Sequence, residues 1–139
     1  MYTEFHFNVE LNIPQDDDIH DILQYMLNQR DTKPNLPDHP FFKCKRWAML
    51  FGCDSYYFNA DTISTCRWDD ISNSYYLCIR SNLKNYDGEI RKFLDWIKQF
   101  VDAGIGEFLG FYRYEEDDDP TLIYYNITKE GPKDVYCWY

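Results

Sequence analysis

The chain begins with a strict alternation of apolar and polar side chains from Glu4 to Ile13. A period of two residues is that of a β-strand, so this segment predicts a strand buried on one face only. Pro14 ends the pattern, because proline cannot donate to a strand ladder. The apolar face of this strand would consist of Phe5, Phe7, Val9, Leu11 and Ile13.

Two segments have the apolar spacing of amphipathic helices. The first follows Asp16 to Asp18, which can supply N-cap oxygens and favourable first-turn charge, and should end by about Arg30. The second should be capped by Asp87 and end at Gly104 and Gly106. The apolar stripes are Ile19, Ile22, Leu23, Met26 and Leu27 in the first helix and Ile90, Phe93, Leu94, Ile97, Phe100 and Val101 in the second.

Between and after the helices, short runs rich in aromatic and β-branched residues predict further strands. A proline-rich connection at 34–40 precedes the first of them, and a turn at Gly52 and Asp54 follows it. Turn-forming residues at 69–73, and the acidic run before Pro120, predict two hairpins. The expected strands are 46–51, 62–68, 75–81, 108–114 and 122–127, with a short aromatic tail at Tyr136 to Tyr139.

This order of elements is typical of an α+β fold. We predict a mostly antiparallel sheet with two helices packed on one face, close to the ferredoxin-like or split βαβ plan, with an extra C-terminal strand. A length of 139 residues predicts a single domain, 1–139. Hydrophobic residues at 45% are enough to form its core.

The net charge of −10 is concentrated in two runs. Asp16 to Asp18 and Glu115 to Asp119 hold eight carboxylates, so the rest of the chain carries a net charge of only −2. Local acidity repels nucleic-acid phosphates and anionic membranes and is attracted to basic surfaces. We therefore expect a protein partner with a basic surface, no direct nucleic acid and no membrane. The oligomeric state stays open, because acidic monomers and dimers have the same sequence signature.

The cysteines and histidines show no recognisable catalytic or zinc-binding spacing. The five cysteines form no CxxC pair, and the sequence has neither a leader pattern nor a run long enough for a membrane span. These features favour free thiols in a cytoplasm, that of the host cell if the gene belongs to a phage. His6, His20 and His39 stand in unrelated contexts. We expect no catalytic residues. The cysteines are Cys44, Cys53, Cys66, Cys78 and Cys137.

Neither a metal nor a nucleotide cofactor is expected. Side chains of consecutive carboxylates point in different directions and lack the spacing of a calcium loop. Gly104, Gly106 and Gly110 lie between a helix and a strand, which is the reverse of the order in phosphate-binding loops.

Tyrosine is the other excess, with 13 residues. Neighbouring tyrosines in a strand face opposite sides, so an uncovered sheet face should display several phenols. Tyrosine suits binding surfaces because it gives a large contact area with few rotatable bonds. Ordinary cross-strand pairing and core filling remain the alternative. The candidate partner-binding residues are Glu115, Glu116, Asp117, Asp118, Asp119, Tyr112, Tyr114 and Tyr76.

The two acidic runs are not equal candidates. Asp16 to Asp18 already have a role at a helix start, whereas Glu115 to Asp119 join two strands and have none. In a ferredoxin-like sheet the two runs would lie at opposite poles. The second run is therefore the better candidate for recognition.

These features favour a small acidic, non-enzymatic inhibitor that occupies a basic, nucleic-acid-binding surface of a host enzyme, as phage or mobile-element counter-defence proteins such as anti-CRISPRs do. A bacterial immunity protein that neutralises a toxin nuclease would use the same physics. Two other hypotheses remain. One is a small enzyme or nucleotide-binding domain with a site of scattered Cys and His residues, and the other is a structural component of a mobile element.

Overall fold

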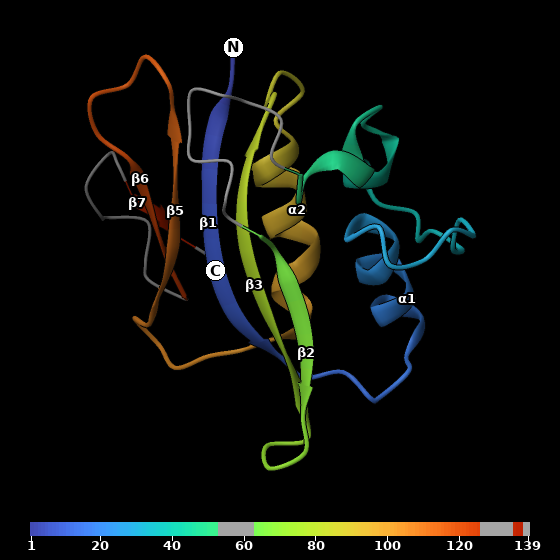
Figure 1. The fold of residues 1–139 in the computed structure, drawn as a ribbon. Coiled ribbons are helices and arrows are strands. Elements are labelled where there is room, and N and C mark those ends of the chain that lie inside the picture. The colour runs from blue at the N-terminus through green and yellow to red at the C-terminus, as the bar shows by residue number, and fades with distance from the viewer. Residues whose placement is uncertain (53–62, 126–134, 138–139) are drawn as a thin grey trace.

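The computed structural model describes residues 1–52 and 63–125, together with the backbone of 135–137. Its sheet has the strand order β2-β3-β1-β5-β6-β7, and a short strand, β4, pairs with β1 (Figure 1). Adjacent strands are antiparallel except for β6 and β7. The strands are β1 (Thr3–Leu11), β2 (Thr65–Asp69), β3 (Ser74–Leu83), β4 (Val101–Asp102), β5 (Phe108–Tyr114), β6 (Thr121–Tyr124) and β7 (Val135–Cys137).

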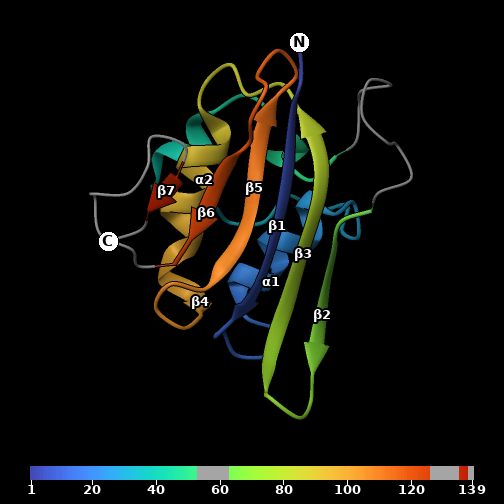
Figure 2. The ribbon, with the colours of Figure 1, turned by 90° about the vertical axis from the view of Figure 1, so that its left-hand side faces the viewer.

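Two α-helices, α1 (Asp18–Met26) and α2 (Glu89–Ile97), lie on the same side of this sheet (Figure 2). Three 3₁₀ turns accompany them: η1 (Pro40–Lys43), η2 (Trp47–Met49) and η3 (Lys98–Phe100). The predicted α+β class, with a mostly antiparallel sheet and two helices, is confirmed. None of the helices in the described residues is long and apolar enough to cross a bilayer.

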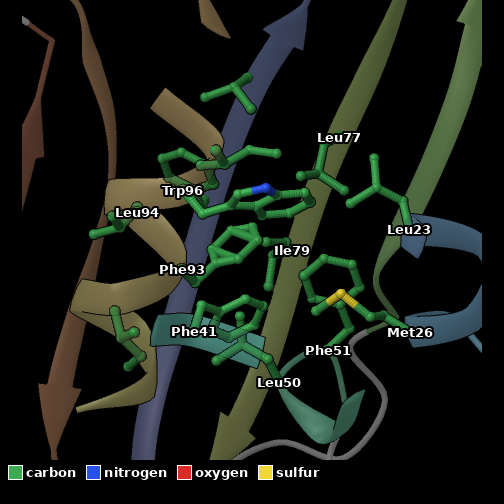
Figure 3. Packing of buried hydrophobic residues seen from close by; sticks show 14 of the residues in the cluster. Leu23, Met26, Phe41, Leu50, Phe51, Leu77, Ile79, Phe93, Leu94 and Trp96 are labelled. Carbon is green, nitrogen blue, oxygen red and sulfur yellow. The ribbon is translucent and has the colours of Figure 1, made fainter. Parts of the chain in front are cut away.

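The core lies between the sheet and the helices (Figure 3). The alternation in β1 is confirmed, since Phe5, Phe7 and Leu11 are completely buried. Phe93 of α2 packs edge-on against Phe5 and Phe7, with 6.2 Å between ring centroids in each pair, and against Phe41 of η1 at 5.4 Å. One apolar face of β1 therefore anchors α2 and the 3₁₀ segment together.

The edge of β1 changes its partner along its length. The antiparallel register with β5 runs from Thr3–Tyr114 to Phe7–Gly110, and β4 then pairs at Glu10–Asp102. Among the described residues, Asn8 and Val9 have no register partner on this side. The sheet is consequently interrupted between β5 and β4.

The predicted strand at 46–51 is wrong. The segment forms η2, in which the Leu50 amide donates to the Trp47 carbonyl at 3.4 Å and the Gly52 amide to that of Met49 at 3.0 Å. Short apolar runs fit a buried turn as well as a strand, and the Leu50 and Phe51 side chains are buried in the core. Asp54 of the predicted turn lies outside the described residues.

The first helix begins as predicted and ends earlier. Asp17 is its N-cap, and the Asp17 Oδ1 accepts a hydrogen bond from the Ile19 amide at 3.0 Å. The helix ends at Met26 instead of Arg30, and Asn28 beyond it has a φ of 59°. A left-handed residue stops a helix because its backbone leaves the helical path.

The predicted boundaries of the second helix are wrong at both ends. Gly88, with a φ of 69°, is the N-cap in place of Asp87, and the Asn85 Oδ1 accepts from the Ile90 amide at 2.9 Å. The helix does not continue to Gly104, because η3 follows Ile97 and the chain then pairs with the end of β1 as β4. This pairing satisfies backbone groups that a longer helix would leave on the sheet edge.

Candidate functional site

The residues Glu115 to Asp119, called here the acidic turn, connect β5 to β6. Backbone groups hold the turn: the Glu115 amide donates to the Tyr2 carbonyl at 3.1 Å and the Asp117 amide to that of Tyr114 at 2.9 Å. The Arg113 guanidinium donates to the Asp117 carbonyl at 3.0 Å. In the described part of the chain, no ion pair includes a carboxylate of the turn. The carboxylates are therefore not needed for the shape of the turn.

The other acidic run has a structural role at the far end of the sheet. Asp17 caps α1, and the Asp16 amide donates to the Tyr75 hydroxyl at 3.1 Å. The acidic turn lies beside the start of β1, whereas Asp16 follows its end (Figure 1). The nine residues of β1 separate the two runs by about 26 Å at ~3.3 Å per residue. The expected placement at opposite poles is confirmed.

The candidate residues Tyr112 and Tyr114 lie close to the acidic turn and share one face of β5. That face is the helix-covered one, because their register partners Phe5 and Thr3 are buried. The Tyr112 hydroxyl accepts a hydrogen bond from the Arg91 Nε on α2 at 3.2 Å. The Tyr114 hydroxyl lies 3.4 Å from the Met1 sulfur. Both phenols thus belong to the edge of the helix layer and not to the uncovered face.

The Tyr114 phenol stays protonated at neutral pH. Partial burial raises its pKa above the ordinary value, and the Glu116 and Glu115 carboxylates raise it further. The protonated phenol is the donor in the contact with the Met1 sulfur.

Tyr76 lies away from the other predicted site residues. It pairs with Glu10 near the end of β1, on the face opposite the helices, and 47% of its surface is exposed. Its neighbour Tyr75 is buried, so the expected opposition of adjacent tyrosines is confirmed. The structure does not bring Tyr76 to the acidic turn, because most of the length of β1 separates Glu10 from Thr3.

The uncovered face is less rich in tyrosine than expected and consists mainly of charged and polar residues. In the half of this face near the start of β1, the His6 ring stacks on Phe111 with 4.7 Å between ring centroids. The His6 Nε2 lies 2.8 Å from the Glu4 Oε1. Burial lowers the His6 pKa, although Glu4 opposes this shift. The Arg113 Nε lies 3.9 Å from the same Glu4, and Arg80 donates to the Asn8 side chain at 2.9 Å. The cations here have partners within the fold.

The half of the uncovered face near the end of β1 contains a groove of about 390 Å³, called here the open-face groove. Its side chains come from β1, β3 and the segment around β4 and β5, so no local sequence signal connects them. The groove lies at the interruption between β5 and β4 described above. The residues that matter for its chemistry are Asn8, Glu10, Tyr76, Asp102, Glu107 and Phe108.

Glu10 is fixed at one side of the open-face groove. Its carboxylate accepts hydrogen bonds from the Ser74 hydroxyl at 2.6 Å and from the Tyr76 hydroxyl at 3.4 Å. This negative charge raises the pKa of the Tyr76 phenol. Glu10 therefore orients the aromatic ring at the mouth of the groove.

The described thiols lack the environment of an activated nucleophile. Burial raises the pKa of Cys44 even though the Lys92 ammonium lies 3.8 Å from its sulfur, and burial raises that of Cys66 to about 12. The His39 Nε2 lies 3.1 Å from the Asp95 Oδ2. The His39 Nδ1 accepts a hydrogen bond from the Phe41 amide at 3.1 Å. Within the described residues, no group of three His, Cys, Asp or Glu residues is placed to hold a metal. Cys53 and Cys137 lie where side chains are not described.

Comparison of the chain with protein-family models, curated proteins and solved structures found no match. Among the described residues, the acidic turn and the open-face groove are surfaces whose charged groups are not needed to hold the fold. They differ in origin, since the turn is a continuous run in the sequence and the groove is assembled by strand pairing.

Proposed function

We propose that this chain is a small, non-enzymatic inhibitor that binds a partner protein through the acidic turn. The observation that carries the proposal is a run of five carboxylates at a hairpin tip whose shape depends on backbone hydrogen bonds. These carboxylates form no ion pair with the described residues, so they are available to cations on another molecule. Such complementary charge accelerates encounter and fixes orientation.

The proposed target is a basic surface that normally holds nucleic acid. The five carboxylates concentrate negative charge at one hairpin tip, as phosphates do along a nucleic-acid strand. Such a cluster suits a group of lysines and arginines that binds a phosphate backbone. The net charge of −10 favours this partner over nucleic acid itself.

Among inhibitors of this type, we favour a counter-defence protein of a phage or mobile element, of the anti-CRISPR kind. Its enzyme target would be a nuclease effector with a positively charged nucleic-acid channel. An immunity protein against a toxin nuclease would use the same acidic turn, so the identity of the partner separates the two functions. Either function places the chain in a cytoplasm, where the free thiols of Cys44, Cys66 and Cys78 would persist.

The ferredoxin-like plan is our proposal for the central part of the fold. The order β2-β3-β1-β5, the antiparallel pairing of these four strands, and the positions of α1 after β1 and α2 after β3 support it. The strands β4, β6 and β7 would then be additions to that plan. The acidic turn would then join the central strand β5 to the added strand β6, where a recognition element leaves the core unchanged.

The test begins with affinity capture of the partner from host lysate and its identification by mass spectrometry. The purified partner is then titrated with the chain in the presence of labelled nucleic acid. We expect displacement of the nucleic acid, with an affinity that falls as the salt concentration rises. A partner that binds the chain and keeps its nucleic acid would contradict the proposal.

A matched pair of variants tests the acidic turn directly. Asp118→Asn with Asp119→Asn removes two exposed carboxylates from the turn and should weaken partner binding by more than tenfold at low salt. Asp16→Asn with Asp18→Asn removes the same charge at the opposite pole and keeps the Asp17 cap, so it should change binding by less than twofold. Equal effects of the two pairs would mean that net charge, and not the turn, governs binding.

A further inference from the structure

The open-face groove opens at the point where β1 changes its partner from β5 to β4. The β5 register ends at Phe7–Gly110, the β4 register begins at Glu10–Asp102, and Asn8 and Val9 lie between them. Both residues line the groove. The groove is thus an interruption in the sheet and not a gap between separate elements.

Three carboxylates surround this interruption. Glu10 and Asp102 are direct partners in an antiparallel register, so their side chains project from the same face of the sheet. Like charges placed opposite each other destabilise a strand pair, and Glu107 adds a third charge to the same groove. No ion pair in the described part of the chain neutralises any of the three.

Two exposed aromatic rings border the same carboxylates. Tyr76 is 47% exposed and Phe108 is 52% exposed, although burial of such rings ordinarily stabilises a fold. The ring centroids of Phe108 and Tyr124 lie 5.4 Å apart, and the Tyr76 hydroxyl donates a hydrogen bond to the Glu10 carboxylate. Each ring therefore has a contact within the fold and keeps about half of its surface exposed.

We propose that the open-face groove binds an arginine side chain from a basic segment of the partner protein. The guanidinium would lie against the Tyr76 and Phe108 rings and donate hydrogen bonds to Asp102 and Glu107. This inference rests on the proposed function, since it adds a second contact to the same partner. The arginine contact would fix the position of a partner that the acidic turn attracts through its charge.

The chemistry of the groove favours arginine over other cations. A guanidinium is planar, stacks on aromatic faces and donates two parallel hydrogen bonds to a carboxylate, whereas an ammonium is a compact, strongly hydrated charge. A divalent metal would gain nothing from the rings, and both Glu10 oxygens already accept hydrogen bonds. A second copy of this acidic chain would bring further negative charge to the groove.

The probe for this site is the capped pentapeptide Gly-Arg-Gly-Arg-Gly, titrated into the ¹⁵N-labelled chain at low salt and followed by amide chemical shifts. We expect saturable shifts at Asn8, Asp102 and Phe108. The lysine version should bind at least threefold more weakly. The citrulline version, which keeps the shape without the charge, should cause no shifts. Equal binding of the lysine and arginine peptides would overturn the assignment to arginine.

Variants distinguish this site from the acidic turn. Asp102→Asn with Glu107→Gln should weaken peptide binding by more than fivefold, while Asp118→Asn with Asp119→Asn should change it by less than twofold. Shifts confined to the acidic turn would overturn the groove and leave the proposed function standing. Binding of the peptide in the groove, together with normal partner binding by the turn variant, would support the groove and contradict the proposed role of the turn.

Discussion

Gly110 of β5 lies directly against the main chain of His6 in β1. A Cβ atom added at Gly110 would overlap the His6 carbonyl oxygen, and the φ of Gly110 is 154°. Gly110 is also the last β5 residue in register with β1, beside the register shift between Phe108 and Gly110. The glycine therefore permits the close approach of the two strands at the point where β5 turns away and the open-face groove begins.

Gly110→Ala should destabilise the fold. The methyl group meets backbone atoms, which cannot rotate aside as a side chain can, so we expect a loss of about 1–3 kcal/mol in the free energy of unfolding. Urea denaturation followed by tryptophan fluorescence measures it. Gly104→Ala is the matched control, because no heavy atom lies within 4 Å of a Cβ added there. That variant should remain within about 0.5 kcal/mol of the unchanged chain. Equal stability of the two variants would contradict the proposed steric role.

Cys66 should react slowly with thiol reagents in the folded chain. A rise in pKa from 9.0 to about 12 lowers the thiolate fraction near neutral pH about 1000-fold, and the thiolate is the reacting species. Burial at Cys44 acts in the same direction. Iodoacetamide labelling at pH 7.5, with peptide mass spectrometry and a urea-unfolded control, measures the rates. Labelling of either cysteine as fast as in the unfolded chain would revive the hypothesis of a thiol enzyme.

The elements with a long periodic pattern could be predicted from the sequence. The alternation from Glu4 to Ile13 identified β1 and its buried face, since a period of two has no competing interpretation over a run of this length. The stripe containing Phe93 and Ile97 identified α2 for the same reason. The two hairpins followed from their turn residues.

Short segments and boundaries were decided by tertiary contacts. Trp47 to Phe51 are apolar enough for a strand, but the segment forms a 3₁₀ turn whose buried side chains join the core. The cap of α2 comes from Asn85, four residues before the helix, because Gly88 takes a left-handed conformation that brings Asn85 to the Ile90 amide. Spacing rules that look one residue before a helix miss such a cap.

The two candidate surfaces differ in the same way. The acidic turn is visible in the sequence because its five carboxylates are consecutive. The open-face groove is not visible, since Glu10 and Asp102 are far apart in the chain and become neighbours only through the pairing of β1 with β4. Tyr76 was predicted as a binding residue through its alternation with Tyr75, but its neighbours in the groove could not be known without the register.

His20 provides a test of how burial affects charge in this fold. It lies in α1 with only 9% of its surface exposed and stacks on Tyr75 with 4.2 Å between ring centroids. Its Nδ1 is buried and has no hydrogen-bond partner among the described residues. Burial lowers the His20 pKa below 6.5, and the nearby Asp16 and Asp21 carboxylates oppose this shift without reversing it.

Stability should therefore fall as the pH drops below about 6.5, because the unfolded chain binds a proton at His20 that the folded chain resists. The loss should continue until the pH reaches the folded pKa and then level off. His20→Phe keeps a ring against Tyr75 and removes the titration, so its unfolding free energy should depend less on pH between 7 and 5.5. The remaining slope should come partly from His6, whose pKa burial also lowers, and His6→Gln should reduce it further. Urea denaturation at fixed ionic strength across this range measures both slopes. An unchanged slope in His20→Phe would mean that folding does not lower the His20 pKa. Water or the two carboxylates would then stabilise the charged ring as well in the folded chain as in the unfolded one.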